Sequence, residues 1–400
     1  MTTEQGKGSR IAMLCLHTSP LDQPGIGDAG GMNVYVRQLA HSLAQRGSSV
    51  DIYTRGEPGQ PSVTLGGGVR VIPIPAGKPG PISKEALADH LGDFARAVGS
   101  NPGYEVIHSH YWMSGVVGLE LAERWGIPLV HTMHTMGKVK KLLQPDAEEP
   151  PRRILAEQDL AHRANRLTAN TSAEAEELVG YYGADATRVD VVPPGVDLSV
   201  FHPGDRPVPP GVPGRMRVVF AGRIQKLKGP QILVRALALL HRQRPELDVK
   251  LTILGARSGS KELNLQCLVE QEGVGHLVRF GLPLPAPQLA HAFRDADLVA
   301  VPSYSESFGL VAIEAQACGT PVLAHRVGGL PYAVKEGYSG VLVPGLEPED
   351  WAAAMIDLAE EPEARQRLGR QAALHARDFS WENTAAAAAV SYDLAMDCGH

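Results

Sequence analysis

Short apolar runs alternate with longer amphipathic segments along almost the whole chain. Residues 11–16 form an apolar run of strand length, and residues 34–45 place apolar side chains at helical spacing. The series continues with strands expected at 49–54, 106–108 and 128–131 and a helix expected at 114–124. This alternation predicts parallel β-sheets whose two faces are covered by helices.

A proline-rich segment interrupts the series near the middle of the chain. Residues 203–214 include Pro203, Pro207, Pro209, Pro210 and Pro213, so this segment is predicted to be a linker. The pattern then restarts. Strands are expected at 218–221, 249–254, 278–280, 298–301, 321–324 and 340–343, a helix at 230–243, and helical structure over about 351–396.

Two α/β domains explain this order. We predict doubly wound, Rossmann-like domains at 1–202 and 215–378, the linker 203–214 between them, and a C-terminal helix at 379–400. A length of 400 residues exceeds what one hydrophobic core usually serves. Open parallel sheets bind ligands outside the carboxyl ends of their strands, so we expect the site in a cleft between two such edges.

Composition and charge exclude some classes of function. Hydrophobic residues make up 44% of the chain and charged residues 20%, which is typical of a globular protein. The net charge is −6 and no dense block of Lys and Arg occurs, which argues against a nucleic-acid surface. Cys15, Cys267, Cys318 and Cys398 form no Cys-x-x-Cys pair, so we expect reduced thiols in a cytoplasmic protein. The apolar runs are too short for a signal peptide or membrane span.

A glycine-rich loop follows the first strand. Gly25, Gly27 and Gly30 match the G-x-G-x-x-G pattern of dinucleotide sites. However, residues 17–24 separate the loop from its strand, and the second strand does not end on an acidic residue. We interpret the loop as one that contacts an anionic ligand at a helix N-terminus, with an ordinary turn as the alternative.

Two cations and two acids mark the second domain. Arg223 follows a strand, and Lys228 directly precedes a predicted helix, an arrangement that suits a diphosphate better than two solvated surface charges. Glu306 and Glu314 are eight residues apart, so on one helix they would share a face. Their carboxylates could accept hydrogen bonds from sugar and ribose hydroxyls.

Histidines cluster at the ends of two strands. His108 and His110 follow one strand, and His131 and His134 follow the next, so both clusters are expected to face the cleft. No matching Cys, Asp or Glu completes a metal site, and structural roles are more common for such histidines. The D-x-D sequence at 295–297 enters an apolar strand, which favours a structural role over nucleotide-metal binding.

Taken together, these motifs resemble the family 4 retaining glycosyltransferases with the GT-B fold, and the resemblance covers nearly the whole chain. The segments 17–21, 30–35, 108–112 and 306–312 are most similar to the D-inositol-3-phosphate N-acetylglucosaminyltransferases of mycothiol biosynthesis. That resemblance implies UDP-N-acetylglucosamine as donor and 1D-myo-inositol 3-phosphate as acceptor. It also implies a homodimer, domain closure around the nucleotide, and a C-terminal helix that crosses back to the first domain.

The resemblance also implies site residues. Those for the donor are Gln23, Pro24, Gly31, Arg223, Lys228, Leu284, Glu306 and Glu314. Those for the acceptor are His17, Asp28, Ala29, Gly30, Gly31, Met32, Asn33, Lys84, Tyr111, Thr135 and Arg152, of which Lys84, Tyr111, Thr135 and Arg152 would hold the phosphate. The residues expected at the reaction itself are His134, Arg223, Lys228 and Glu306.

No cofactor is expected for the chemistry. The resemblance implies a structural Mg²⁺ near Phe293, Arg294, Ala296 and Thr320, where three of the four residues could bind only through backbone oxygens. No carboxylate is clearly placed as a nucleophile. The sequence therefore suggests that the acceptor hydroxyl attacks on the same face as the departing phosphate, with His134 orienting the sugar.

Other functions remain open at this point. One is a glycosyltransferase of the same fold that uses another acceptor, as sucrose-phosphate synthase does, or a lipid-linked inositol. Another is a sugar-nucleotide epimerase or an NAD enzyme, because fold alone does not decide activity. A third is a sugar-nucleotide sensor that binds the donor without turnover.

Overall fold

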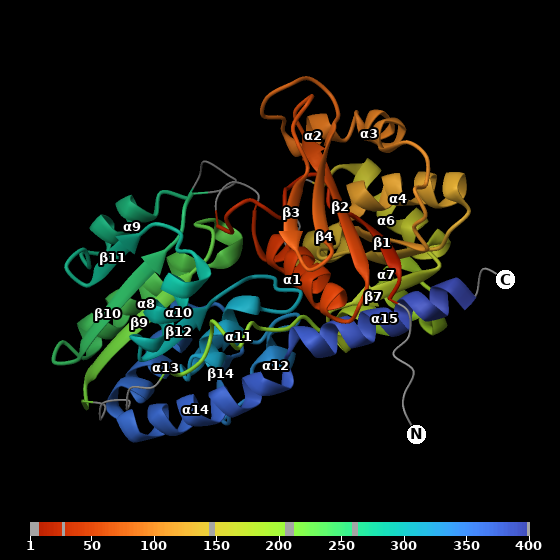
Figure 1. Cartoon of the computed structure of the whole chain (residues 1–400). Helices are drawn as coiled ribbons and strands as arrows, with labels where there is room; N and C mark the ends of the chain where they lie inside the picture. Colours follow the sequence, from red (N-terminus) through yellow and green to blue (C-terminus); the bar gives the residue numbers. More distant parts are fainter. Residues whose placement is uncertain (1–7, 26–28, 144–148, 205–211, 258–262, 398–400) are drawn as a thin grey trace, which may run out of the picture. The chain divides into compact units, whose positions relative to one another are not determined.

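The structure, a computed structural model, describes residues 8–25, 29–143, 149–204, 212–257 and 263–397 (Figure 1). The chain divides into two compact units. Unit 1 comprises Met1–Asp22, Gly31–Pro193 and Trp381–His400, and unit 2 comprises Gln23–Gly30 and Pro194–Ser380. Each unit is described by itself.

Unit 1 is built on an eight-stranded sheet with the order β3-β4-β2-β1-β5-β6-β7-β8. All neighbouring strands are parallel except β3 and β4, which form an antiparallel edge pair. The strands are β1 (Arg10–Leu14), β2 (Ser49–Gly56), β3 (Val63–Gly66), β4 (Val69–Pro75), β5 (Val106–His110), β6 (Leu129–Thr132), β7 (Arg166–Ala169) and β8 (Val189–Val191). Their central residues are buried, as the uninterrupted apolar runs predict for a sheet covered on both faces.

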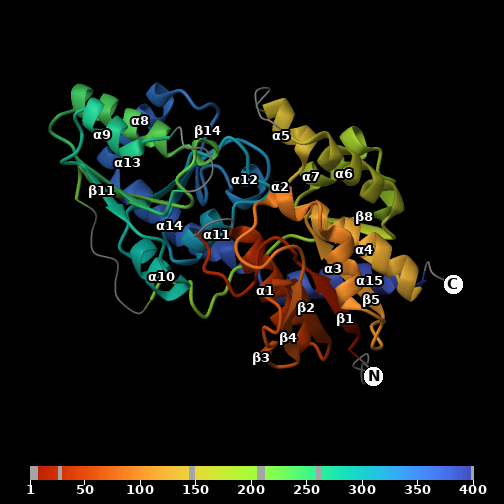
Figure 2. The ribbon, with the colours of Figure 1, turned by 90° about the horizontal axis from the view of Figure 1, so that it is seen from above.

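The helices of unit 1 lie on both faces of this sheet. They are α1 (Gly31–Gln45), α2 (Lys84–Leu87), α3 (Leu91–Val98), α4 (Trp112–Trp125), α5 (Gly137–Leu143), α6 (Pro151–Arg163), α7 (Ser172–Tyr182) and α15 (Trp381–Asp397). The helices α5, α6 and α7 contact one another (Figure 2). The C-terminal helix α15 packs against α1 and against β5, β6 and β7, so the end of the chain completes the fold of unit 1.

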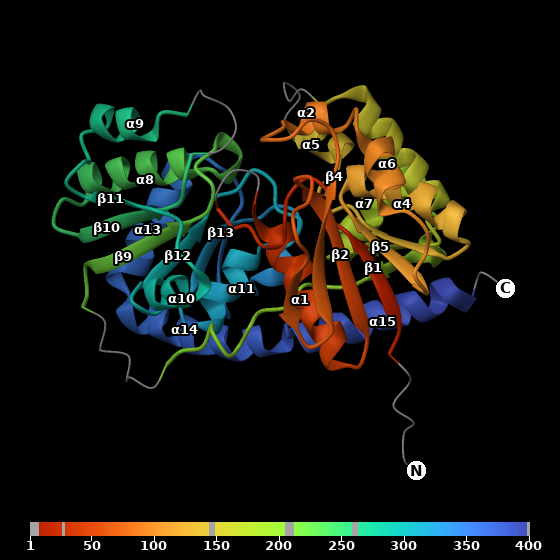
Figure 3. The same cartoon turned by 45° about the horizontal axis from the view of Figure 1, so that its top comes forward.

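Unit 2 contains a six-stranded, all-parallel sheet with the order β11-β10-β9-β12-β13-β14. Its strands are β9 (Arg215–Ala221), β10 (Asp248–Leu254), β11 (Val278–Gly281), β12 (Leu298–Val301), β13 (Val322–His325) and β14 (Gly340–Val343). Its helices are α8 (Pro230–Gln243), α9 (Leu265–Gln271), α10 (Ala286–Arg294), α11 (Leu310–Ala317), α12 (Leu330–Ala333), α13 (Pro348–Glu360) and α14 (Pro362–His375). Figure 3 shows α8 and α9 on one side of this sheet and α10 and α11 on the other.

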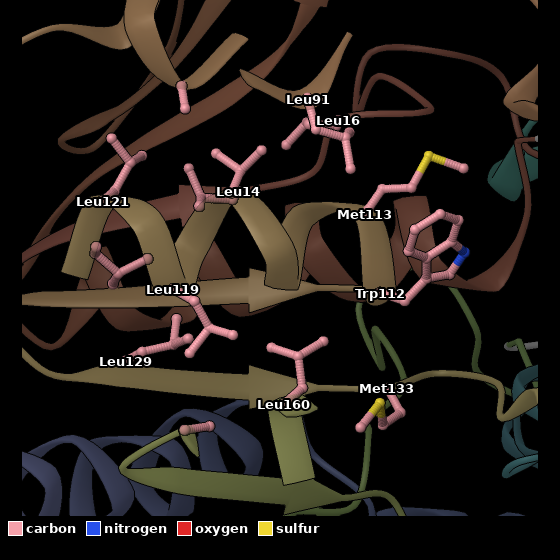
Figure 4. Packing of buried hydrophobic residues seen from close by; sticks show 14 of the residues in the cluster. Leu14, Leu16, Leu91, Trp112, Met113, Leu119, Leu121, Leu129, Met133 and Leu160 are labelled. Carbon is pink, nitrogen blue, oxygen red and sulfur yellow. The ribbon is translucent and has the colours of Figure 1, made fainter. Parts of the chain in front are cut away.

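The two faces of each sheet bury separate apolar clusters. In β9, Val218 and Phe220 pack with α8 and α13, whereas Val219 between them packs with α10 and α11. This follows from the two-residue period of a strand. In unit 1, Leu14 of β1 and Leu129 of β6 belong to one cluster with side chains of α4 and α6 (Figure 4). The two sheets therefore hold their own cores and fix the strand ends on which the predicted site depends.

Three boundaries differ from the sequence predictions. The region expected to be helical from about 351 to 396 is three helices, because Pro362 starts α14 and the segment 379–380 precedes α15. The boundary between the first and second unit lies at Pro194, whereas the sequence prediction placed the end of the first domain at residue 202. The backbone N–H of Val196 donates to the Phe379 carbonyl at 3.1 Å, and the ring of Phe201 packs near that of Phe293, which ties this stretch to unit 2.

The linker prediction at 203–214 falls mostly outside the described residues, since 205–211 are not described. Within the described part of the chain, no helix is long and apolar enough to span a membrane.

Candidate active site

Each sheet reverses its strand order at one point, and several of the predicted site residues follow the strands beside it. In unit 2, β9 lies between β10 and β12. From β9 the sheet grows in one direction through β10 to β11, and from β12 it grows in the other direction through β13 to β14, so the strand order reverses between β9 and β12. In unit 1, β1 lies in the same way between β2 and β5. The loops after such strands diverge and leave a crevice at the carboxyl edge, which is where open α/β sheets bind ligands.

Arg223 follows β9 at the reversal point of unit 2. Gly222, between the strand and Arg223, has φ 155°, and its carbonyl lies so close to Gly255 that a Cβ on Gly255 would meet it at 1.9 Å. Among the described residues, Arg223 has no ion pair or side-chain hydrogen bond. Its guanidinium is therefore available to a ligand from this part of the chain.

Lys228 ends a short 3₁₀ helix, Lys226–Lys228, just before α8. The next residue, Gly229, has φ 73°, and a Cβ there would meet the Pro302 carbonyl oxygen at 1.9 Å. Only glycine fits this position, because it combines a left-handed backbone with a close approach to the loop after β12. The turn thus holds Lys228 beside that loop and next to the N-terminus of a helix, where anions are favoured.

Glu306 lies in the loop after β12 and is paired with Lys228. The Nζ of Lys228 is 2.6 Å from Oε1 of Glu306, and the hydroxyl of Ser303 donates to the same oxygen at 2.9 Å. Gly328 supports the loop, because a Cβ there would meet the Glu306 carbonyl at 2.1 Å. Both charged side chains are partly exposed, at 25% for Lys228 and 17% for Glu306. A cation and a carboxylate therefore face solvent together at this edge.

The prediction that Glu306 and Glu314 share one helix face is wrong. The helix α11 begins at Leu310, after Gly309 with φ 105°, so Glu306 precedes it and only Glu314 is helical. Burial raises the pKa of the Glu314 carboxyl to about 8. In the described chain no hydrogen bond or ion pair reaches this carboxyl, so nothing offsets the desolvation that favours its protonated form.

The loop before α1 belongs to unit 2 rather than to unit 1. The amide of Gln23 donates to the Pro283 carbonyl at 3.1 Å, which places Gln23 and the following Pro24 beside the predicted Leu284. A Cβ on Gly30 would lie 4.0 Å from the Nε of Arg223. Ala29 is buried, and its carbonyl accepts from the Gly25 N–H at 2.9 Å. Asp28 lies outside the described residues.

The start of α1 differs slightly from the prediction. The helix begins at Gly31, so Gly31, Met32 and Asn33 form its first turn. Asn33 is buried, and its amide nitrogen donates to the Thr18 hydroxyl at 2.7 Å and to the Ser19 carbonyl at 2.6 Å. Asn33 thus fastens the helix to the loop after β1.

Two residues of unit 1 hold strained backbones at adjacent strand ends. Tyr111 directly follows β5 with φ 72°, and His134 lies just after β6 with φ 59°. In the described chain no other non-glycine residue has a positive φ. Such conformations cost energy and cluster at functional sites. The ring of His17, which follows β1, lies 4.4 Å from the Tyr111 ring, so three predicted residues meet at this edge.

His134 is held by aromatic neighbours. Its Nε2 is 3.0 Å from Nδ1 of His110, and its ring meets the edge of Tyr35 at a centroid distance of 5.0 Å. Burial, with smaller contributions from His131 and His17, lowers the pKa of His134 to about 3. It is therefore a neutral imidazole at physiological pH, able to donate or accept a hydrogen bond but not to carry charge.

The four residues predicted to hold a phosphate are linked through α6. Arg152, in its first turn, donates to Asp89 at 2.6 Å and to the Glu85 carbonyl, which places it at α2 beside Lys84. The next residue, Arg153, donates to both the carbonyl and the hydroxyl of Thr135 at 3.0 Å.

Arg153 also reaches the last of the four residues. Its guanidinium carbon lies 5.2 Å from the ring centre of Tyr111. Arg153 therefore lies against Thr135 and Tyr111, whereas the guanidinium of Arg152 is held at Asp89 and Glu85.

We predicted that the other clustered histidines face the cleft, and this prediction is wrong. His108, His110 and His131 are fully buried. His108 bonds the Tyr392 hydroxyl of α15 at 2.7 Å and the Thr132 hydroxyl at 2.8 Å, and burial lowers the pKa of each of the three rings. These are structural groups. Asp297 is structural as well, because its carboxylate accepts from the backbone N–H of Arg217 at 2.8 Å, as predicted for the D-x-D sequence.

The residues expected around Mg²⁺ lie at the C-terminal end of α10. The Thr320 hydroxyl donates to the Phe293 carbonyl at 2.6 Å, and the Arg294 guanidinium donates to the His202 carbonyl at 3.2 Å. The set offers oxygen atoms but no carboxylate, whereas proteins usually bind Mg²⁺ through one or two carboxylates. It fits a weakly held structural ion at most.

Sequence reasoning missed three supporting residues: Arg153, Ser303 and Gly328. The family resemblance assigned a role only to Arg152. Its neighbour Arg153 was not considered, although consecutive residues of a helix point about 100° apart and therefore meet different partners. Ser303 lies only three residues before Glu306 in the same loop, and Gly328 acts through a close approach to that loop from a more distant part of the chain. No local pattern marks the contact of Gly328.

Family models match both halves of the chain. Residues 30–195 match the model described as "Glycosyl transferase 4-like domain", and residues 206–375 match "Glycosyl transferases group 1".

Solved structures share the fold. Sucrose-phosphate synthase from Thermosynechococcus elongatus superposes with a TM-score of 0.86 at 30% identity, over 96% of this chain and 98% of that one. Anabaena Alr3699/HepE in complex with UDP and glucose superposes at 0.74 with 21% identity, over 96% of this chain and 99% of that one. The fold is thus GT-B, with two parallel-sheet α/β domains.

Relatives of similar length are closer in sequence. A D-inositol 3-phosphate glycosyltransferase of Paenarthrobacter aurescens is 52% identical, over 96% of this chain and 98% of the relative. One from Thermobifida fusca is 46% identical, over 97% of this chain and 94% of the relative. The chain therefore belongs to the family of the D-inositol 3-phosphate glycosyltransferases.

Proposed function

We propose that this enzyme transfers N-acetylglucosamine from UDP-N-acetylglucosamine to 1D-myo-inositol 3-phosphate with retention of configuration, the first step of mycothiol biosynthesis. The observation that carries this proposal is 52% identity, over 96% of the chain, to a protein named D-inositol 3-phosphate glycosyltransferase. The cations and hydroxyls at the two sheet edges support it, because both substrates carry phosphate.

Unit 2 supplies the donor groups in this proposal. Arg223 and Lys228 hold the diphosphate, Glu314 binds the ribose, and the backbone of Leu284 meets the uracil. When the bond between the sugar and UDP breaks, negative charge builds on the diphosphate. Arg223, Lys228 and the start of α8 stabilise that charge, which is the largest kind of catalytic contribution in such reactions. Glu306 contacts the sugar and keeps Lys228 oriented through their 2.6 Å contact.

Unit 1 supplies the acceptor groups. Lys84 and Arg152 provide positive charge for the phosphate, and Tyr111 and Thr135 provide hydroxyl donors. His17 and the first turn of α1 meet inositol hydroxyls. The amide nitrogen of Asn33 already donates to Thr18 and Ser19, so we assign Asn33 the task of fixing that turn.

The transfer proceeds on one face of the sugar. The acceptor oxygen bonds to the anomeric carbon as the bond from that carbon to the UDP oxygen breaks, and the hydroxyl proton passes to the departing phosphate. His134 orients the sugar as a neutral hydrogen-bonding group, which agrees with the lowered pKa of about 3. No cofactor takes part, and the Mg²⁺ near Thr320, if bound, is structural.

The setting of the reaction is part of the same proposal. We place the enzyme in the cytoplasm as a homodimer. The free thiols of Cys15 and Cys318 are buried, which suits a reducing compartment. Binding of UDP-N-acetylglucosamine and 1D-myo-inositol 3-phosphate requires no nucleic acid and no stable membrane association.

The second candidate is transfer to another sugar phosphate. It is favoured by the 0.86 TM-score with sucrose-phosphate synthase, but that protein is only 30% identical. A panel of acceptors separates the candidates: inositol 3-phosphate, fructose 6-phosphate and no acceptor, each with UDP-N-acetylglucosamine. We expect product only with the inositol phosphate, and an α linkage by proton NMR.

Three other outcomes would contradict the proposal. Transfer to fructose 6-phosphate would favour the second candidate, and a converted sugar nucleotide without acceptor would identify an epimerase. A β linkage would overturn retention.

A further inference from the structure

Arg153 is a buried cation directly behind the predicted phosphate site. Its side chain is only 6% exposed, compared with 41% for the neighbouring Arg152 on the same helix. Consecutive residues of a helix point about 100° apart, so one of the two arginines faces solvent and the other faces the interior. A buried charge is costly unless it is paired, which raises the question of what Arg153 does.

The partners of Arg153 hold it in one orientation. Its Nε donates to Glu157 at 2.6 Å, and its Nη1 donates to Glu149 at 2.7 Å. Glu157 is itself fixed by the Tyr182 hydroxyl at 2.5 Å and the Gly137 N–H at 2.8 Å. These contacts tie together α5, α6 and α7, which lie side by side (Figure 2). The guanidinium is therefore in place before any ligand binds.

The remaining nitrogen of Arg153 reaches Thr135. Nη2 donates at 3.0 Å to both the carbonyl and the hydroxyl oxygen of that residue. A hydroxyl that accepts from a cation keeps its own hydrogen for another acceptor. Because Arg153 donates to the Thr135 hydroxyl oxygen, the hydrogen of that hydroxyl points away from Arg153 and can be donated to another group. The same guanidinium lies 5.2 Å from the ring centre of Tyr111, whose backbone is strained at φ 72°.

We propose that Arg153 is a positioning residue for the acceptor phosphate, acting through Thr135 and supporting Tyr111 without touching the substrate. The inference rests on the proposed function. It deepens that function by naming the residue that makes the phosphate site selective. Without the guanidinium, the Thr135 hydroxyl would be free to turn and its hydrogen would no longer be directed toward the phosphate.

Steady-state kinetics of Arg153→Lys test this role, with Arg163→Lys as the matched control on the exposed side of α6. We expect the KM for inositol 3-phosphate to rise about tenfold or more, with kcat and the KM for UDP-N-acetylglucosamine nearly unchanged. Arg163 is 51% exposed and pairs with Asp159, so its replacement should leave all three constants unchanged. An unchanged KM for the phosphorylated acceptor in folded Arg153→Lys would overturn the inference.

A double-mutant cycle with Thr135→Val shows whether the effect passes through Thr135. The two rises in KM should combine to less than their product, because each change removes the same donor. Multiplicative effects would mean that Arg153 meets the phosphate independently, and would contradict the proposal.

If Arg153→Lys does not fold, Tyr182→Phe replaces it. This change removes one support of Glu157 and leaves Arg153 in place. We expect a smaller rise in the same KM, and an unchanged value would overturn the inference. The wild-type enzyme tests the proposed function separately from the role of Arg153. Wild-type activity that does not need the phosphorylated acceptor contradicts the proposed function. Wild-type activity that needs it, together with unaffected variants, contradicts only the role of Arg153.

Discussion

At the scale of single residues, the proposed donor site at the carboxyl edge of the unit 2 sheet contains two cations with different surroundings. Lys228 is paired with Glu306 at 2.6 Å, whereas Arg223 has no ion pair within the described chain. Both follow the strand at which the sheet of unit 2 reverses its order. Their shared position, rather than the charge of either one, supports the diphosphate site that the proposed function assigns to them.

Replacing Lys228 with Ala should reduce kcat by about 10²–10³-fold, because one stabilising charge for the departing diphosphate is lost. The melting temperature should change little, since a partly exposed ion pair is worth about 0–1 kcal/mol. Initial rates of UDP release measure the effect. Lys226→Ala, an exposed lysine on the same 3₁₀ helix, is the control. Near-normal turnover of Lys228→Ala would remove Lys228 from the mechanism.

Glu314→Gln should stabilise the ligand-free enzyme, and more so as the pH rises. The pKa of Glu314 is raised from 4.5 to about 8, so between these values the unfolded chain loses a proton that the folded protein keeps. The wild type therefore loses stability as the pH rises through this window, and a glutamine does not.

Thermal melts of the two proteins give the comparison. We expect equal melting temperatures near about pH 5 and a gain of roughly 2–4 °C for Glu314→Gln near about pH 8.5. The exposed Glu349→Gln serves as control, and a difference that does not depend on pH would refute the raised pKa.

The residue scale also shows how far the sequence could be interpreted. The positions of Arg223 after a strand and of Lys228 before a helix could be predicted from the chain itself, whereas the roles of Tyr111 and His134 were implied only by the family resemblance. The placement of Glu306 on a helix was wrong, because Gly309 delays the start of α11 to Leu310. The burial of His108 could not be foreseen, since its partner Tyr392 is 284 residues away.

At the scale of elements, α15 shows what a sequence pattern leaves open. A separate C-terminal helix at 379–400 was predicted, and the family resemblance implied that it crosses back to the first domain. The structure confirms this, because α15 follows Ser380 and packs on the sheet of unit 1. Trp381 meets the ring of Tyr35 at 5.6 Å at one end, and Tyr392 bonds His108 farther along. Alternating apolar segments predict a strand or a helix, but not the unit against which it packs.

Tyr392→Phe should destabilise unit 1 without entering the chemistry. The change leaves Nδ1 of His108 buried without its partner, which costs about 1–3 kcal/mol. Thermal unfolding followed by circular dichroism should show a lower melting temperature, while Asp393→Asn, an exposed neighbour on α15, should match the wild type. An unchanged melting temperature for Tyr392→Phe would mean that this contact does not anchor α15.

At the scale of the whole molecule, the work is divided between two units. The cations assigned to the donor, Arg223 and Lys228, belong to unit 2, and the residues assigned to the acceptor phosphate belong to unit 1. The proposed transfer would need groups of both units at one anomeric carbon, so closure of the two units around the nucleotide stays a prediction of the proposed function. The fold class was predictable because strand and helix periods recur throughout the chain. The arrangement of substrates depends on contacts that no local pattern encodes.

The most direct test of the central claim is the rate of UDP release from UDP-N-acetylglucosamine by the wild-type enzyme with three additions: 1D-myo-inositol 3-phosphate, unphosphorylated inositol, or nothing. We predict rapid release only with the phosphorylated acceptor, because Lys84, Arg152, Tyr111 and Thr135 are assigned to its phosphate. Equal release with unphosphorylated inositol, or none with inositol 3-phosphate, would contradict the account.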